Sequence, residues 1–330
     1  MSQFRMNFLT MEWVIVAPER AKRPDEFKNK ETKAPLPEFD KTCPFCPGNE
    51  DKTPPEVAVK KSNGKWISRV VLNKFAAVSP DTDASRKIDL PYVSAGGFGV
   101  AEVLVESPKH NDNIVNMPQK QVQGIIELYR ERYADLSKRD HIDTIVIFKN
   151  HGRKAGTSLN HPHSQIIATS MVPPQTRIPL QYARDFHDSY GLCPYCMMLG
   201  SELKVKKRII LENEHFVAFC PYASKSPFEV KISPKRHQSR FDRINDKEVA
   251  SLAETLSTVL KQIYVGLGDP DYNYVIRTSP NSDGDLHYEH WRLDIVPKIT
   301  TPAGFELGSG IFINTVPPEI AAEFLKKVKV

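Results

Sequence analysis

The sequence contains no apolar run long enough to cross a bilayer, which argues against a transmembrane helix. Its first residues, MSQFRMNFLTMEW, lack the basic, apolar and small-residue succession of a secretory signal, so a cytoplasmic location is expected. Basic residues are scattered and the net charge is only +5, so nucleic acid is not expected as a partner. The 330 residues, 40% hydrophobic and 26% charged, have an ordinary globular composition and a length that suits two domains.

Cysteine is scarce, but its arrangement is informative. Four of the five cysteines form two identical spacings, Cys43-Pro-Phe-Cys46 and Cys193-Pro-Tyr-Cys196. The fifth, Cys220, lies in the apolar run FVAFC, where a small buried side chain is expected. Without a signal peptide, paired CxxC motifs indicate metal binding or redox chemistry rather than structural disulfides.

The chain contains the same order of features twice. In each half a CxxC motif precedes strand-like stretches that end in a histidine, His110 or His237. A long amphipathic helix, a strand and a last histidine, His161 or His290, follow at nearly equal intervals. We therefore expect an α+β fold of two tandem repeats, residues 1–180 and 181–330, each an antiparallel sheet with one long helix.

The secondary structure of each repeat is readable from the hydrophobic periodicity. Apolar residues recur at helical spacing in both halves, at Val122, Ile126, Tyr129, Tyr133 and Leu136, and at Val249, Leu252, Leu256, Val259 and Ile263. Asn245 and Glu248 predict a capping box at the start of the second helix. Strands are expected at 144–148 and 272–276, and again at or just past the last histidine of each half.

The repeated cysteines and histidines predict two structural metal sites. Thiolates and neutral imidazoles suit Zn²⁺, which takes four such ligands in a tetrahedron. The predicted ligands are Cys43, Cys46, His110 and His161 in the first half, and Cys193, Cys196, His237 and His290 in the second. A single CxxC could be a chance pair of thiols, and a redox pair would need an exposed setting near a βαβ unit. Duplication with matched histidines favours two zinc sites.

The halves differ where their last histidines lie. The first reads His161-Pro-His163-Ser-Gln165, whereas the second has a histidine only at His290 and reads HWRLD. Residues two apart on a strand point the same way, so His163 would lie beside a metal-bound His161 and stay free. The preceding loop, with Gly156 and Ser158, is expected to form an anion nest of backbone N–H groups. This arrangement indicates a nucleophilic imidazole that forms a covalent phosphohistidine; the alternative is a glycine-rich turn with a third metal ligand.

The motif HPHSQ, preceded by the pattern N-x-G-x-x-x-G-x-S, closely resembles the active-site signature of galactose-1-phosphate uridylyltransferases. That family is a two-repeat branch of the histidine-triad superfamily. Other segments resemble the family in the same order along nearly the whole chain: EWVIVAPERAKRP (12–24), CPFCPGNE (43–50), LNKFAA (72–77), VESPKH (105–110), PFEVKISPKRH (227–237) and GFELG (304–308).

The resemblance implies a mechanism and further site residues. His163 would attack the α-phosphorus of a UDP-sugar and hold UMP until a second sugar 1-phosphate takes it, in ping-pong exchange of glucose for galactose. Its other ring nitrogen would donate a hydrogen bond to a backbone carbonyl, and Gln165 would hydrogen-bond the phosphoryl oxygens. Substrate contacts are implied at Arg20, Arg23, Asn73, Asn150, Gly156, Ser158, Phe305 and Glu306. The last two match a segment that reaches the sugar in a neighbouring subunit, which implies a homodimer.

The chain departs from the better-known bacterial pattern at three places. Asp294 and Val296 stand where two iron-binding histidines would be, while a second CxxC is present, as in two-zinc, plant-like relatives that use other nucleotide sugars. Lys74 follows Asn73 where the family has a carboxylate near the nucleoside. The lysine and glutamine around the sugar have no clear counterparts beside Glu306.

Three functions are therefore weighed. UDP-glucose:galactose-1-phosphate uridylyl exchange is the leading hypothesis. The second is a related nucleotidyl transfer, such as phosphorolysis of ADP-glucose or another nucleoside diphosphate sugar. The third is a zinc-stabilised nucleic-acid-binding protein, which the scattered lysines and the asymmetry around HPHSQ disfavour.

Overall fold

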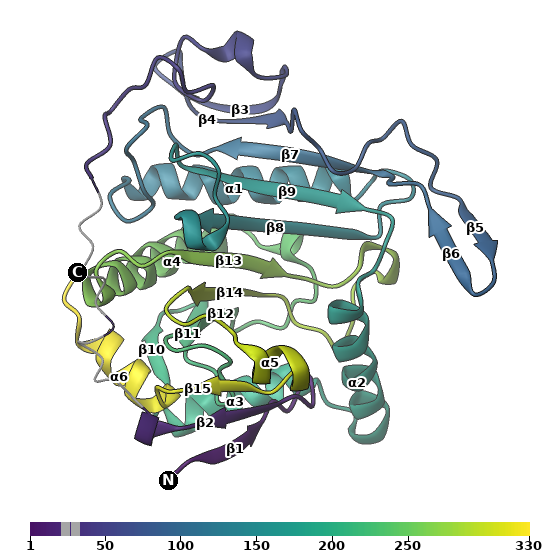
Figure 1. Ribbon diagram of the computed structural model, residues 1–330, viewed down its shortest axis with the longest axis vertical. Helices are drawn as coiled ribbons and strands as arrows, with labels where there is room; N and C mark the ends of the chain where they lie inside the picture. The colour runs from purple at the N-terminus through teal and green to yellow at the C-terminus, as the bar shows by residue number, and fades with distance from the viewer. Residues whose placement is uncertain (21–26, 28–33) are drawn as a thin grey trace.

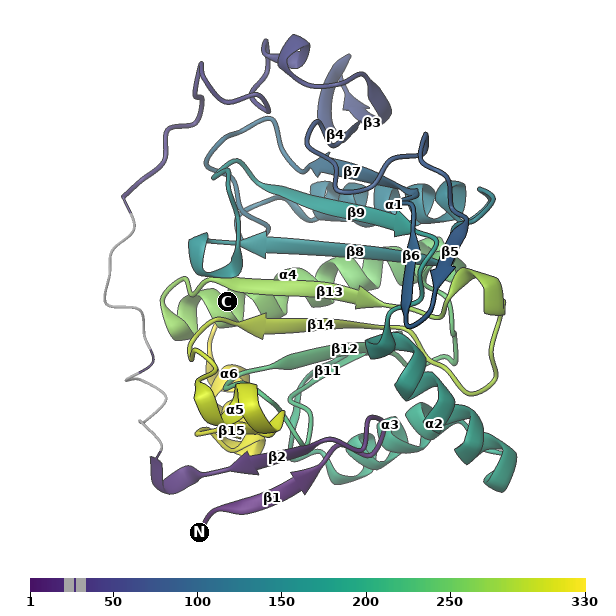
Figure 2. The same ribbon diagram turned by 45° about the vertical axis from the view of Figure 1, so that its right-hand side comes forward.

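A computed structural model describes residues 1–20, 27 and 34–330. One ten-stranded antiparallel sheet runs through both halves of the chain (Figures 1 and 2). Its strands are, in spatial order, β10 (Ile209–Glu212), β11 (Phe216–Phe219), β12 (Val230–Pro234), β14 (Arg292–Pro297), β13 (Tyr272–Arg277), β8 (Thr144–His151), β9 (His163–Thr169), β7 (Gly99–Val105), β4 (Lys65–Leu72) and β3 (Glu56–Ser62). The first half supplies β3, β4, β7, β8 and β9, the second half supplies β10 to β14, and the halves meet where β8 pairs with β13. The expected α+β fold of two repeats is confirmed.

Two long helices, α1 (Gln119–Leu136) and α4 (Asp246–Leu267), lie side by side against one face of the sheet (Figure 1). Both predicted apolar faces are buried. The predicted capping box is present, since Glu248 N donates to Asn245 Oδ1 at 3.0 Å and Asn245 N donates to Glu248 Oε2 at 2.9 Å. The two helices and the face of the sheet that they cover form the main hydrophobic core.

The remaining elements lie around this core. A small sheet joins β1 (Gln3–Met6) and β2 (Trp13–Val16) to β15 (Phe312–Asn314), so the start of the chain packs with the second half. The other helices are α2 (Pro174–Tyr190), α3 (Pro194–Val205), α5 (Gly304–Ser309) and α6 (Pro318–Lys327), and short 3₁₀ turns cover 18–20, 50–52, 153–155, 241–243 and 281–283. Residue 180 lies inside α2, and the continuous sheet joins the two repeats.

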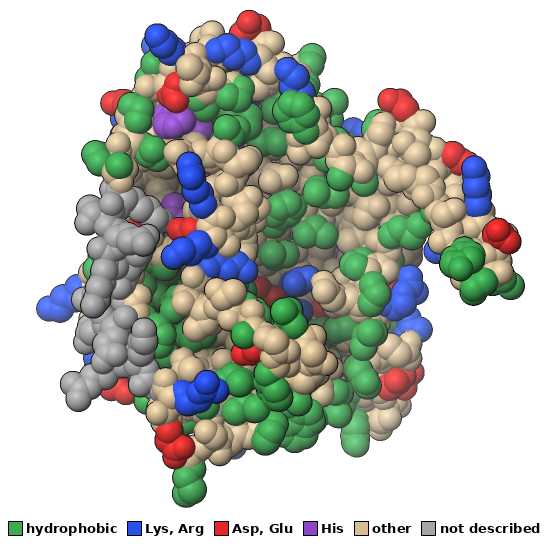
Figure 3. All heavy atoms as spheres, in the orientation of Figure 1, with side chains coloured by type: hydrophobic (Ala, Val, Ile, Leu, Met, Phe, Trp, Pro, Cys, Tyr) green, Lys and Arg blue, Asp and Glu red, His purple; other side chains and the backbone are tan. Residues whose placement is uncertain are grey.

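A separate hairpin, β5 (Arg86–Asp89) and β6 (Tyr92–Ala95), projects from the body with exposed hydrophobic side chains (Figure 3). None of the helices in the described residues is long and apolar enough to span a bilayer.

Alternation along the strands separates the two faces of the sheet. On β9, Ile166 and Ala168 belong to the core beneath the helices. His163 and Gln165 therefore project from the opposite face, because side chains on a strand alternate. The same alternation on β14 sends Leu293 into the core and Asp294 to the opposite face. This second face carries the candidate site.

Candidate functional site

His163 is the first residue of β9, and its ring is held in one orientation. Its Nδ1 lies 2.8 Å from the backbone carbonyl oxygen of His161, to which it donates. The other ring nitrogen, Nε2, then carries the lone pair, and it has no hydrogen-bond partner in the described part of the chain. Only 8% of His163 is exposed, and burial lowers the pKa of the imidazole, which favours the neutral, nucleophilic form. The ring of Phe45 packs against it with centroids 5.5 Å apart.

The four predicted ligands of the first metal site come together and are buried. The ligand atoms of Cys43, Cys46, His110 and His161 all lie within 4.8 Å of one another. Sγ of Cys46 is 3.6 Å from Nδ1 of both histidines. The Nε2 atom of His161 donates to the carbonyl of Ser107 at 2.8 Å, which orients Nδ1 toward the thiols.

The second cluster brings together three of its four predicted ligands, Cys193, Cys196 and His237. Nδ1 of His237 is 3.2 Å from Sγ of Cys196, and its Nε2 donates to the carbonyl of Leu286. His290 is outside this group, although its ring centroid is 5.6 Å from that of His237. The Nε2 atom of His290 is buried and has no hydrogen-bond partner among the described residues. Its role as fourth ligand stays a prediction.

In each cluster the surroundings of one cysteine raise the pKa of its thiol. Burial raises the pKa of Cys43, and the hydrogen bond from Cys193 to Cys196, together with burial, raises the pKa of Cys193. Buried thiols near each other resist ionisation unless a positive charge lies between them. Two thiols and two imidazoles form the donor set that Zn²⁺ prefers, so the residues of the first cluster fit a structural zinc ion.

The loop from Asn150 to Asn160 precedes His163, and four of its backbone N–H groups are not available for the expected nest. The backbone amides of residues 154–157 are already engaged, Lys154 N by Asp271 Oδ2 at 2.7 Å and the next three by carbonyls of the loop itself. These four amides are therefore unavailable to an anion, and the prediction fails for them. The side chain of Ser158 is exposed, and that of Asn150 is half-buried.

Glycine is required at the start of this loop. Gly152 has φ of +84°, and a Cβ there would lie 2.0 Å from Oδ1 of Asp271. The second half of the chain thus contacts the loop backbone directly. Gly156 also has a positive φ, +92°.

The other predicted contacts are dispersed. Asn73 follows β4, and its backbone N–H donates to Ala101, which pairs with Ile167 on β9. The register therefore places Asn73 near the face that carries Gln165. Arg23 lies outside the described residues. Arg20 is exposed, and its charge helps local backbone N–H groups lower the pKa of Glu306.

Phe305 and Glu306 lie on α5, in the second half of the chain. Glu306 lines a cavity of about 610 Å³ that includes neither His163 nor Gln165. The interpretation that this segment acts in a neighbouring subunit, and the homodimer it requires, stay predictions.

That cavity occupies the position in the second half that corresponds to His163 and Gln165 in the first. Gln165 pairs with Phe148, Phe148 with Val275, and Val275 with Asp294, so Gln165 and Asp294 lie symmetrically about the β8–β13 seam. Arg292 then occupies the position that corresponds to His163, and its guanidinium lies 3.5 Å from Asp294. A guanidinium held by carboxylates is not a nucleophile, so this half lacks the reactive group.

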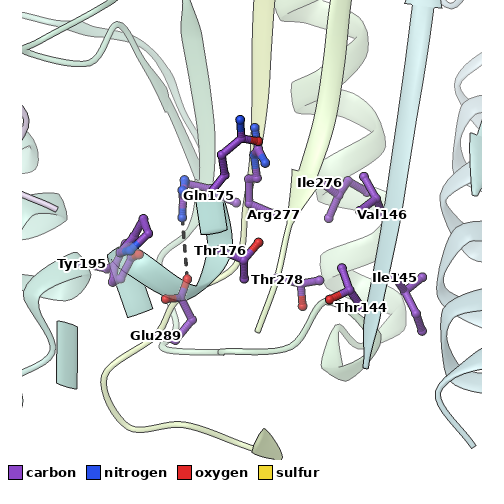
Figure 4. Close-up of a pocket in the computed structure, with 12 residues that line it drawn as sticks. Thr144, Ile145, Val146, Gln175, Thr176, Tyr195, Ile276, Arg277, Thr278 and Glu289 are labelled. Atoms are coloured by element: carbon purple, nitrogen blue, oxygen red, sulfur yellow. Dashed lines mark ion pairs between the residues drawn. The ribbon is translucent and has the colours of Figure 1, made fainter. Parts of the chain in front are cut away.

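A smaller pocket shares Gln175, Arg277 and Arg292 with the cavity and extends to Thr144 and Ile145 (Figure 4). Figure 4 shows Glu289 beside Tyr195, where an ion pair ties Glu289 to Arg292 at 3.7 Å. Neither reactive residue of the first half lines this pocket.

A buried ion pair behind His163 was not predicted. Nζ of Lys149 is 2.5 Å from Oε2 of Glu106 and donates to the carbonyl oxygen of His163 at 3.2 Å. Both side chains are buried, 2% and 0% exposed. Nothing in the sequence distinguishes Lys149 from other lysines on strands. Its partner, Glu106, lies far away in the chain and is brought close only by the folded sheet. The pair holds the backbone of His163 from the helix side of the sheet.

Replacing Lys149 by methionine is expected to lower the free energy of unfolding by about 3–5 kcal/mol, because the carboxylate of Glu106 then stays buried without a cation. Combining Lys149→Met with Glu106→Gln should recover most of that loss, since no uncompensated charge remains. Urea unfolding of the two single variants and the double variant measures the effect. A Lys149→Met protein as stable as wild type would show that the pair does not contribute in this way.

Comparisons with known proteins agree with this geometry. Residues 1–173 match the family model of the galactose-1-phosphate uridyl transferase N-terminal domain, and residues 112–329 match a domain of unknown function (DUF4921). The chain is 37% identical to ADP-glucose phosphorylase of Arabidopsis thaliana, over 99% of this chain and 93% of the relative. It is 31% identical to galactose-1-phosphate uridylyltransferase of Thermotoga maritima, over 100% of this chain and 99% of the relative.

Solved structures show the same likeness. A crystal structure of an ADP-glucose phosphorylase from Arabidopsis thaliana with bound ADP-glucose superposes with a TM-score of 0.85, at 34% identity and full coverage of both chains. A uridylyltransferase structure superposes with a TM-score of 0.76, at 30% identity, over 99% of this chain and 98% of the other.

The duplicated α+β fold and the relatives that match it along the chain place the protein among nucleotidyltransferases of the histidine-triad type. Within that class, the chain belongs to the galactose-1-phosphate uridylyltransferase family.

Proposed function

We propose that the protein transfers a nucleotidyl group from a nucleoside diphosphate sugar through a covalent intermediate on His163. The observation that carries this proposal is the 2.8 Å bond from Nδ1 of His163 to the carbonyl of His161, which leaves Nε2 with the lone pair. Nε2 attacks the α-phosphorus, the bond from that phosphorus to the bridging oxygen breaks, and the sugar 1-phosphate leaves. An oxygen of the acceptor phosphate then attacks the same phosphorus, and the P–N bond to His163 breaks.

Gln165 supports transfer rather than hydrolysis. It lies two residues after His163 on the same strand, so its amide reaches the same side of the sheet. A neutral amide donates to phosphoryl oxygens but provides no acidic proton for a leaving group. A sugar 1-phosphate leaves as an anion without being protonated, so the amide suffices.

We propose ADP-glucose as the nucleotide sugar and inorganic phosphate as the acceptor, so that the products are glucose 1-phosphate and ADP. The 37% identical relative is named as an ADP-glucose phosphorylase, and a structure similar along the whole chain holds ADP-glucose. In addition, Lys74 stands where the uridylyltransferase pattern has a carboxylate beside the nucleoside.

The second candidate is exchange of UMP between UDP-glucose and galactose 1-phosphate. The match of residues 1–173 to the uridyl transferase family model supports it. The 31% identity to the Thermotoga maritima uridylyltransferase, over essentially all of both chains, also supports it. Both candidates use the same chemistry at His163.

We also propose that both cysteine-histidine clusters hold Zn²⁺. Cys43, Cys46, His110 and His161 would provide a complete tetrahedral set, and Cys193, Cys196 and His237 would provide three ligands of the second. We propose that both ions act as structural cross-links; in the first cluster the closed four-ligand site would leave no open position for a reaction.

One experiment separates the two candidates. The protein is incubated with ADP-glucose or UDP-glucose labelled at the α-phosphate and is then tested for acid-labile label. We expect label from ADP-glucose, released as ADP when phosphate is added. Label from UDP-glucose alone, released as a UDP-sugar by galactose 1-phosphate, would replace the first candidate by the second. No label from either nucleotide sugar would end both proposals.

A further inference from the structure

We propose that Asn273, from the second half of the chain, is a positioning residue for nucleotidyl transfer in the first half. It fixes the direction of the Asn150 side-chain amide and holds the loop that follows Asn150. The inference rests on the proposed function, because it concerns the rate at which His163 takes up the nucleotidyl group.

The contact crosses the seam between the halves. Asn273 on β13 pairs directly with Asn150 on β8. Nδ2 of Asn273 donates to Oδ1 of Asn150 and to the carbonyl oxygen of Ala155, both at 2.8 Å. One amide of the second half thus holds both the strand end and the loop beyond it.

These two bonds determine which way both amides face. The carbonyl of Ala155 is only an acceptor, so the atom of Asn273 beside it must be the NH₂ group. The second hydrogen of that NH₂ group requires an acceptor, which makes the facing atom of Asn150 its oxygen. The Nδ2 donor of Asn150 is consequently turned away from Asn273.

The freed donor lies on the side where a phosphoryl group would bind. A Cβ built on Gly156 would be 3.7 Å from Nδ2 of Asn150, so this donor lies over the exposed turn of the loop. Phe148 pairs with Gln165, and continuing that antiparallel register places Asn150 beside His163. Asn150 therefore offers a hydrogen-bond donor next to the nucleophile, and Asn273 decides that it is a donor and not an acceptor.

This placement predicts an unusual order of variant effects. Asn273→Ala removes the restraint but leaves Asn150 free to turn its donor outward. Asn273→Asp replaces the NH₂ group by an acceptor, so Asn150 turns its own NH₂ group inward and presents its oxygen to the phosphoryl oxygens. We expect label incorporation to slow about tenfold in Asn273→Ala and about a hundredfold in Asn273→Asp, the range of one or two hydrogen bonds to a charged group.

Asn281→Ala is the matched control. Its amide also crosses from the second half, donating to the carbonyls of Ser137 and Ile142 at 2.7 and 2.9 Å, but before the start of β8. It is expected to lower thermal stability as much as Asn273→Ala and to leave the rate of label incorporation within about twofold. If Asn273→Asp, which keeps the shape of asparagine, reacts as fast as Asn273→Ala or faster, Asn273 merely fills space and the inference is overturned.

A second comparison tests whether Asn273 acts through Asn150. In an Asn150→Ala background no amide is left to turn, so Asn273→Asp and Asn273→Ala are expected to react at equal rates. If Asn273→Asp still reacts about tenfold more slowly than Asn273→Ala in this background, the aspartate repels the substrate directly and the positioning role is overturned. The wild-type protein separates failure of the proposed function from failure of this inference. Absence of label in wild type refutes the proposed function. If wild type is labelled and the Asn273 variants are labelled as fast as the Asn281→Ala control, only this inference is refuted.

Discussion

The His163→Ala protein takes up no label from either nucleotide sugar, and its steady-state rate falls by about 10⁴-fold or more. This is the expected result because the side chain supplies the atom that bonds to phosphorus, and removing a nucleophile abolishes the covalent route. In this variant the side chains of Gln165 and Asn150 can still donate hydrogen bonds to the phosphoryl oxygens. Position 163, however, no longer provides a lone pair to attack phosphorus. Rapid-quench measurement of acid-labile label, with turnover measured in parallel, records both losses.

Two controls separate chemistry from folding. His163 is no member of the first metal cluster, so His163→Ala should retain the metal content and the thermal midpoint of wild type. His215→Ala, a change on the turn before β11 in the other half, is expected to react like wild type. Stoichiometric label on the His163→Ala protein would place the intermediate on another residue and remove the basis of the proposed mechanism.

The local elements of this fold could be predicted from the sequence because each has its own periodic signal. The apolar faces of α1 and α4, the capping box at Asn245 and the strands beside the last histidines all follow from residues close in sequence. The first metal cluster could also be predicted, since the repeat supplies matched ligands at similar intervals. Duplication conveys long-range information that a single motif lacks.

The contacts across the seam could not be predicted, because no local pattern states which strands pair. Pairing of β8 with β13 brings Asn273 to Asn150 and Asp271 to the loop after it. The expected anion nest fails at residues 154–157 for the same reason. The carboxylate of Asp271 accepts the hydrogen bond from the backbone N–H of Lys154, and the next N–H groups donate to carbonyls within a 3₁₀ turn. Glycines in a loop show that the backbone turns sharply, but they do not show which acceptors its N–H groups meet.

We expect loss of the first cluster to affect catalysis more than loss of the second. Cys46 belongs to the first cluster with His161, and the carbonyl of His161 accepts the hydrogen bond that orients His163. Cys196 belongs to the second cluster, whose members lie in the other half and make no hydrogen bond to His163 among the described residues. A cation held by the first cluster would therefore restrain the backbone that fixes the nucleophile, whereas the second would stabilise only its own half.

Replacing Cys46 by serine is expected to remove about one ion per chain and to lower the free energy of unfolding by about 5 kcal/mol, part of the roughly 10–16 kcal/mol that zinc contributes in small zinc domains. Cys196→Ser should remove one ion as well, and its destabilisation should be of similar size because both sites tie a CxxC loop to its sheet. Metal analysis and thermal unfolding measure these losses. A Cys46→Ser protein with the metal content of wild type would show that the first cluster is not the site.

The rate of label incorporation then distinguishes the two variants. At a temperature where both are folded, Cys46→Ser should react at least about tenfold more slowly than Cys196→Ser, because only the first change releases the segment from His161 to His163. The rate falls because the imidazole loses its fixed orientation, and a ring that is free to rotate rarely points Nε2 at phosphorus. Equal rates in the two variants would mean that the strand pairs of β9 and the Lys149–Glu106 pair hold the nucleophile unaided.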